Sequence, residues 1–200
     1  MKRILVTGGA GFIGSHLCVR LLNEGCQVVC LDNFLTGSPK NIQHLTANPN
    51  FQMAEQDITT PYCPDGPIDE IYNLAAQSHV QVSFDAPEYS GDVDALGVLR
   101  VLEAVRVCGL TKTCKVYQAS TSELYGKVEE VPQNEKTPFH PYSPYAVAKQ
   151  YGFWITKEYR EAYNMFCCSG ILFNHESERR GETFVTVSYT HLTLPTILRV

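Results

Sequence analysis

Short apolar runs alternate with segments of helical periodicity along the first 173 residues. Six runs have the length of strands: "RILVT" (3–7), "QVVCLD" (27–32), "FQMAEQD" (51–57), "DEIYNLAA" (69–76), "KVYQAS" (115–120) and "MFCCSGILF" (165–173). Helical periodicity follows at "FIGSHLCVRLLNEG" (12–25), at 86–109 and at 144–163. Strands that alternate with helices predict a doubly wound α/β fold, in which helices cover both faces of a parallel sheet.

The last residues depart from this pattern. "VSYTHLTLPT" (187–196) has no helical period, and its ten residues are the in-frame translation of a transposon adapter used in sequencing libraries. We therefore expect residues 1–185 to form one domain and residues 186–200 to be a non-native, unstructured tail.

Composition narrows the class of protein. At 200 residues and 44% hydrophobic, the chain can bury a core, and its net charge of −5 argues against a nucleic-acid partner. The apolar run in "MKRILVTGG" is too short for a signal peptide or a membrane span, so we expect a cytoplasmic protein without a membrane partner. Eight cysteines without a C-x-x-C pair and six scattered histidines predict reduced thiols and no metal site.

Glycines follow the first strand in "VTGGAGFIG". Gly9-x-Gly11-x-x-Gly14 and the overlapping Gly8-x-x-Gly11-x-x-Gly14 stand between a strand and a helix. Such glycines allow a tight turn and bring a pyrophosphate close to backbone N–H groups at the positive end of the helix. We assign this loop to a dinucleotide, with contacts from Gly8, Gly11, Phe12, Ile13 and Gly14.

Polar and small residues follow the next three strands. Asp32 ends the second strand, 18 residues past Gly14, where a carboxylate accepts hydrogen bonds from a ribose 2′-hydroxyl and repels a 2′-phosphate. This position taken alone favours NAD. Further predicted cofactor contacts follow the third strand (Asp57 and Ile58) and the fourth (Leu74, Ala75, Ala76, Gln77 and Ser78).

"SPYAVAK" contains Tyr145-x-x-x-Lys149. Ser143 can cap a helix that begins at Pro144, so Tyr145 and Lys149 fall on one helical face. A nearby ammonium favours the phenolate, which makes tyrosine a usable base. Together with the glycine loop and "ASTSELYG" (119–126), this pair resembles the extended short-chain dehydrogenase/reductase family, in which Ser/Thr, Tyr and Lys act on a sugar hydroxyl. If residues 119–123 stay extended, Thr121 and Glu123 point the same way, and Glu123 can serve as the base that a dehydratase needs.

From residue 69 to 185 the resemblance is to the GDP-mannose 4,6-dehydratases, through "YNLAAQSHVQVSF", "YQASTSELYG", "SPYAVAK", "REAYN" and "GILFNHESERRG". It implies a catalytic role for Thr121, Glu123, Tyr145 and Lys149, with cofactor contacts from Tyr89, Tyr145, Lys149, His175 and Arg180. It also implies NADP, GDP-mannose as substrate, oxidation at C4, loss of water across C5 and C6, and reduction at C6. A smaller substrate-binding domain would follow, and the full-length parent would be a homo-oligomer through exposed apolar positions on 86–109 and 144–163.

The first 65 or so residues resemble other families. "GGAGFIGSHL" and "VVCLDNFLTGSPKNIQHL" look like UDP-glucuronate decarboxylase or dTDP-glucose 4,6-dehydratase, and the dehydratases that use NADP carry arginine-bearing sequence where this chain has Asp32-Asn33. Segments 1–68 and 69–185 are hypothesised to come from two genes joined within "DEIYNLA" (69–75). NAD and NADP both stay open. The rival functions are a UDP-sugar epimerase or decarboxylase and an inactive fragment that only binds a dinucleotide.

Overall fold

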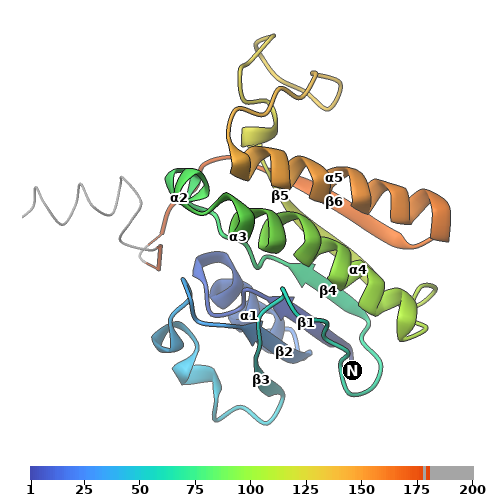
Figure 1. Cartoon of the computed structure of the whole chain (residues 1–200). Helices are drawn as coiled ribbons and strands as arrows, with labels where there is room; N and C mark the ends of the chain where they lie inside the picture. Colours follow the sequence, from blue (N-terminus) through green and yellow to red (C-terminus); the bar gives the residue numbers. More distant parts are fainter. Residues whose placement is uncertain (178, 181–200) are drawn as a thin grey trace, which may run out of the picture.

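The computed structural model describes residues 1–177, 179 and 180, and its centre is a parallel sheet of six strands (Figure 1). The strands lie in the order β3-β2-β1-β4-β5-β6. Their bounds are β1 (Arg3–Thr7), β2 (Gln27–Asp32), β3 (Phe51–Glu55), β4 (Glu70–Asn73), β5 (Lys115–Thr121) and β6 (Phe166–Leu172). This is the order of a dinucleotide-binding Rossmann sheet, with its topological switch between β1 and β4. The predicted doubly wound α/β fold is confirmed.

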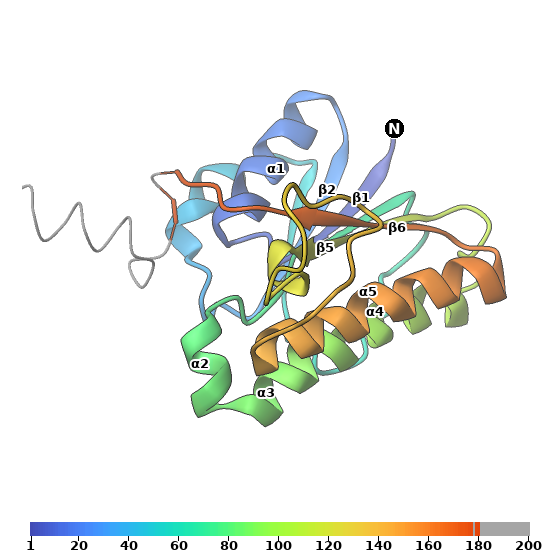
Figure 2. The same ribbon diagram turned by 90° about the horizontal axis from the view of Figure 1, so that it is seen from above.

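The helices form two layers (Figure 2). Helix α1 (Phe12–Asn23) packs against β1 and β2 on one face, with the short turns η1 (Pro39–Asn41) and η2 (Gln43–Leu45) beyond it. The other face carries α2 (Val80–Asp85), α3 (Pro87–Gly91), η3 (Asp92–Leu96), α4 (Gly97–Val107) and α5 (Pro144–Tyr163). The turn η4 (Ser122–Leu124) directly follows β5.

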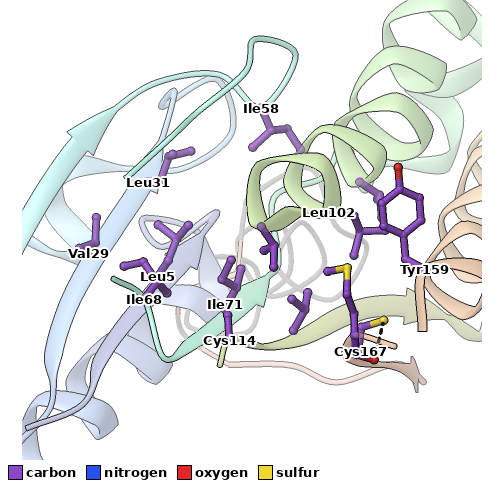
Figure 3. Close-up of a cluster of buried hydrophobic side chains, with 14 of the residues drawn as sticks. Leu5, Val29, Leu31, Ile58, Ile68, Ile71, Leu102, Cys114, Tyr159 and Cys167 are labelled. Atoms are coloured by element: carbon purple, nitrogen blue, oxygen red, sulfur yellow. Dashed lines mark hydrogen bonds between the residues drawn. The ribbon is translucent and has the colours of Figure 1, made fainter. Parts of the chain in front are cut away.

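Each layer has its own hydrophobic core. Between the sheet and α4 and α5, side chains such as Leu5, Ile71, Leu102 and Tyr159 interlock (Figure 3). On the α1 side, Ile4, Val6, Val28 and Cys30 meet the apolar face of α1. Residues that alternate along β1 therefore serve opposite cores, as expected for a buried parallel strand.

Helix α5 begins and ends where its sequence predicts. The Ser143 hydroxyl accepts a hydrogen bond from the Ala146 N–H (3.0 Å), and Pro144 occupies the first turn. Asn164 ends the helix in the left-handed conformation (φ 53°). On its outer side α5 exposes Val147 and Trp154.

The predicted helical stretch over 86–109 is confirmed as Pro87–Val107, in which α3, η3 and α4 follow one another without leaving the right-handed helical region. The short helix α2 before it was not predicted. Helix α2 ends at Asp85, Ala86 leaves the helical region (φ −134°, ψ 65°), and Pro87 starts α3. The residue before a proline is forced out of the α conformation, which explains the break. A π-helical turn, η3, then joins α3 to α4.

The prediction of eight reduced cysteines is wrong for one pair. Cys63, in the loop after β3, forms a disulfide with Cys108 at the end of α4, across 45 residues of sequence. That loop packs on α4 through the core, where Ile58 and Tyr62 contact the same cluster as Val105. Tertiary packing brings the two thiols together, and the spacing of the cysteines in the sequence does not predict this pair. The other six cysteines are free.

Cys167 and Cys168 alternate as expected for β6, one buried and one exposed. Among residues 1–177, 179 and 180, no helix has the length and hydrophobicity to cross a membrane, and no group of three candidate metal ligands occurs. Residues 181–185 of the predicted domain and the predicted tail 186–200 lie outside the described residues.

Candidate active site

The glycine loop forms a close turn between β1 and α1. Gly8 has a positive φ of 67°, and a Cβ there would lie 2.7 Å from the Ala75 backbone nitrogen. A Cβ on Gly14 would collide with the Gly8 carbonyl oxygen. Gly11 caps α1 without a side-chain hydrogen bond, and no acidic residue stands in the first turn of that helix. The N–H groups of Phe12 and Ile13 thus begin a helix whose positive end suits a pyrophosphate.

Asp32 is buried beside this loop. Its carboxylate accepts hydrogen bonds from the Ala10 N–H (2.9 Å) and the Phe34 N–H (2.8 Å), and Gly37 leaves room for it. Burial raises the pKa of Asp32, while these backbone donors oppose the rise. The carboxylate is therefore held in one position at the end of β2, where the ribose of a dinucleotide was predicted.

Asp57 follows the next strand, β3, and its charge acts on the nearby Tyr89. Asp57 accepts hydrogen bonds from the Asn33 side-chain amide (2.7 Å) and the Thr59 N–H (2.8 Å). Burial raises the pKa of Tyr89, and the nearby charge of Asp57 raises it further. The side chain of Ile58 is buried in the core next to Gly97 of α4.

The loop after β4 lies against the glycine loop. The N–H groups of Leu74 and Ala75 donate to the Thr7 hydroxyl oxygen (3.1 and 3.2 Å). Ala76 is half-buried and Ser78 exposed, whereas Gln77 is buried and its N–H donates to Asp94 Oδ1 (2.9 Å). Small residues thus allow two backbones to meet at the switch point between β1 and β4.

Residues 119–123 do not all stay extended, so the condition under which Thr121 and Glu123 would point the same way is not met. Strand β5 stops at Thr121, and residues Ser122–Leu124 form the 3₁₀ turn η4. The Thr121 hydroxyl oxygen accepts a hydrogen bond from the Glu123 N–H (3.2 Å), a local bond that replaces the strand ladder. Thr121 is buried at the strand end and Glu123 is exposed on the turn. Glu123 therefore follows Thr121 through the turn and not by strand alternation.

Tyr145 and Lys149 stand on the first turns of α5, which packs against β5 and η4. Both side chains are buried, and the Lys149 ammonium lies 5.8 Å from the centre of the Tyr145 ring. Lys149 Nζ donates to the Ala119 carbonyl oxygen (3.2 Å), so the ammonium is held against the end of β5. The four predicted catalytic residues are thus placed by two adjoining elements, the end of β5 with η4 and the start of α5.

The segment after β6 crosses the N-terminus of α1. The His175 ring lies 5.4 Å from the Phe12 ring, and Ser177 Oγ lies 3.0 Å from His16 Nε2. Arg180 donates to the His175 carbonyl oxygen and pairs with Glu176 (3.2 Å). The structure therefore brings His175 to the first turn of α1, beside the glycine loop.

Comparison with protein families matches residues 5–196 to the family described as GDP-mannose 4,6 dehydratase. The chain is 52% identical, over 202 residues, to the GDP-mannose 4,6 dehydratase 2 of Caenorhabditis elegans; this covers 94% of the chain and 53% of the relative. The chain belongs to the GDP-mannose 4,6-dehydratase family. It spans about half the length of the curated relatives it matches.

Solved structures of enzymes with two different activities share the fold of this chain. A dTDP-glucose 4,6-dehydratase from Streptomyces venezuelae, solved with NAD bound, superposes with a TM-score of 0.87 at 26% identity, covering 97% of the chain and 62% of that protein. A UDP-galactose 4-epimerase superposes with a TM-score of 0.86 at 28% identity, covering 98% and 63%. The fold therefore does not separate dehydratases from epimerases, whereas the sequence places the chain among the former.

The sequence analysis did not predict the polar residues that lie behind the site and hydrogen-bond to its members or to one another. Asn33 holds Asp57, Asp94 holds Gln77, and Asn73 and Gln118 are buried in the strands. The sequence does mark Asp94, Asn73 and Gln118 as unusual, because each places a polar side chain where the periodicity of its element requires an apolar one.

Proposed function

We propose that this chain is the cofactor-binding and catalytic half of a nucleotide-sugar 4,6-dehydratase that acts on GDP-mannose. The observation that carries the proposal is the placement of Tyr145 and Lys149 on α5 beside Thr121 and the adjoining Glu123. Three of these side chains are buried at the carboxyl end of the sheet, and the fourth is a carboxylate that reaches out from the same edge.

Each residue has a distinct task in this proposal. Thr121 would accept or donate a hydrogen bond at the sugar O4, and Tyr145 would take the proton of the C4 hydroxyl. Lys149 would stabilise the tyrosinate, and Glu123 would remove the C5 proton once C4 is a ketone. The glycine loop, Asp32 and the loop 74–78 would hold a nicotinamide dinucleotide, which supplies the means to oxidise C4 and reduce C6 when bound.

Glu123 separates this proposal from its rival, a UDP-sugar epimerase. Exchange of configuration at C4 needs no base for the C5 proton, whereas elimination of water does. The exposed position of Glu123, two residues after the buried Thr121, supports a role toward a bound sugar.

Replacement of Glu123 by glutamine tests the proposed reaction. The assay uses the chain continued with the C-terminal part of the C. elegans relative and follows the product formed from GDP-mannose by mass spectrometry. Loss of a general base lowers the rate by about 10²-fold or more, so E123Q is expected to lose dehydration while binding of reduced dinucleotide is retained. E135Q changes an exposed glutamate of the neighbouring loop and serves as the control.

Two results would contradict the proposal. Dehydration by E123Q at the parent rate would remove Glu123 from the reaction, and epimerisation of a UDP-sugar by the parent would favour the rival. If the chain bound dinucleotide but turned over no nucleotide-sugar, the result would favour the hypothesis that it is a binding module without enzyme activity.

We further propose that the cofactor is NAD. Asp32 holds a fixed carboxylate at the end of β2, and the segment "NFLTGSPKNIQHLTANPN" (33–50) that follows contains no arginine. A carboxylate near the ribose repels a 2′-phosphate, and arginine is the usual partner of that phosphate.

Fluorescence titration with NADH and NADPH measures this preference. The chain is expected to bind NADH more tightly, and D32N is expected to lower the NADH-to-NADPH affinity ratio by about tenfold because one negative charge is removed beside the phosphate. D85N, an exposed aspartate on α2, is the matched control. Equal affinities in the parent chain would refute the NAD proposal.

We also infer that residues 186–200 are foreign to the domain and that segments 1–68 and 69–185 have separate origins. The resemblance of residues 187–196 to a translated adapter supports the first inference, and the change of resemblance near residue 69 supports the second. Reading the source locus across codons 55–75 and past codon 185 tests both, since one uninterrupted gene of 200 codons would refute them.

A further inference from the structure

Three buried polar side chains form a row across the centre of the sheet. Thr7, Asn73 and Gln118 stand at aligned register positions on β1, β4 and β5, so each is the direct neighbour of the next. Their exposed fractions are 1%, 1% and 2%. We name these three residues the polar row.

Packing alone does not require polar residues here. Two positions earlier, the same strands place Leu5, Ile71 and Val116 at aligned register positions on the same face, and all three belong to the core beneath α4 (Figure 3). A buried hydroxyl or amide costs free energy unless its hydrogen bonds are made. Three polar side chains in place of one more apolar layer therefore point to a task other than packing.

The hydrogen bonds of the polar row run in one direction. The Thr7 hydroxyl donates to Asn73 Oδ1 (2.5 Å), and Asn73 Nδ2 donates to Gln118 Oε1 (2.6 Å). Gln118 Nε2 donates to the carbonyl oxygen of Ala119 (2.9 Å). The direction is set by the Ala119 carbonyl, which can only accept: exchanging the oxygen and nitrogen of Gln118 would break both of its bonds.

The row ends at the catalytic lysine. The Ala119 carbonyl that accepts from Gln118 is the same group that accepts from Lys149 Nζ (3.2 Å). Lys149 is itself 4% exposed, so this carbonyl oxygen is a hydrogen-bond acceptor for a side-chain nitrogen that burial removes from water.

The other end reaches the two loops that were assigned to the cofactor. Thr7 directly precedes Gly8, and its hydroxyl oxygen accepts from the N–H groups of Leu74 and Ala75. The polar row thus connects both loops to Lys149 through side chains of three adjacent strands.

We propose that Asn73 and Gln118 are positioning residues, which fix the Ala119 carbonyl and with it the Lys149 ammonium relative to the glycine loop and the loop 74–78. The role assigned to Lys149 rests on the proposed function. The position of its ammonium does not, and it is measured without substrate.

The test follows the ammonium protons of Lys149 by ¹⁵N nuclear magnetic resonance, with the signal assigned by its absence in K149M. In the unchanged chain the signal is expected to exchange slowly with solvent. Q118M keeps the side-chain length but removes both hydrogen bonds, and exchange is expected to be about tenfold faster, as for the loss of one buried hydrogen bond.

A second variant separates positioning from stability. In N73L/Q118M both amides become apolar, so no partner amide is left unsatisfied, and the thermal midpoint is expected to recover relative to Q118M. Exchange at Lys149 is expected to stay fast. T156V removes a buried hydroxyl on α5 that donates to the Gly152 carbonyl (2.7 Å), outside the polar row, and is expected to leave exchange unchanged.

Slow exchange in the folded double variant would overturn the proposal, because the polar row would then serve stability alone. A fast-exchanging Lys149 in the unchanged chain would overturn it as well. Absence of dehydratase activity would instead bear only on the proposed function, since the readout requires neither sugar nor turnover.

Discussion

Asp94 is a carboxylic acid enclosed on all sides. It lies in the π-helical turn η3, its exposed fraction is zero, and its Oδ1 accepts from the Gln77 N–H. Its Oδ2 has no hydrogen-bond partner among the described residues. Burial raises the pKa of Asp94 to about 7, against the opposing effects of the Lys149 charge and the Gln77 N–H. A group with this pKa changes its charge near neutral pH, close to the lysine of the site.

The pH dependence of stability tests this residue. Because the pKa of Asp94 is raised in the folded chain, the folded state binds one more proton than the unfolded state between about pH 4 and pH 7. As the pH rises through that window, the free energy of unfolding falls by about 1.4 kcal/mol for each pH unit. D94N cannot ionise, so its stability relative to the unchanged chain is expected to rise from pH 5 to pH 7 and level off above pH 8.

Urea unfolding at pH 5, 6, 7 and 8 measures the difference. D85N, which changes an exposed carboxylate, is expected to show a constant difference across the same range. A constant difference for D94N would show that Asp94 ionises normally in the folded chain.

Among the helices, strands and loops, a feature could be predicted from the sequence when the residues that cause it lie close to it in the chain. The ends of α5 could be predicted because Ser143, Pro144 and Asn164 act within a turn of the helix they limit. The glycine loop could be placed for the same reason, since Gly8 has a positive φ and a Cβ on Gly14 would collide with Gly8 of the same loop.

Other features depend on contacts that the sequence does not order. The end of β5 is decided by whether the Thr121 hydroxyl or the next strand captures the Glu123 N–H, and periodicity is silent on that competition. The polar row exists only once the register of three strands is known, because Asn73 and Gln118 are 45 residues apart. The sequence shows each member as a polar residue in an apolar strand, but it does not show that the three are hydrogen-bonded to one another.

At the scale of the whole molecule, the Cys63–Cys108 bond ties the loop after β3 to the far end of α4. Mass spectrometry after alkylation in denaturant is expected to count six thiols without reductant and eight with it. In the folded chain Cys168 is expected to react first because it is exposed on β6, while Cys167 on the opposite face is buried. Eight thiols without reductant would show that the bond is absent, as is usual for proteins kept in a reducing compartment.

The central position of β1 has a consequence for how the site comes into being. Parallel neighbours cannot be joined by a hairpin, so each pairing must close a loop of chain, and closure becomes costlier with length. The β1–β2 pair closes a short loop, whereas Thr7 and Asn73 are 66 residues apart. Contacts of such separation form late in folding. We therefore expect the glycine loop and helix α5 to come together only after β1 and β2 have paired, so that the site is completed late in folding.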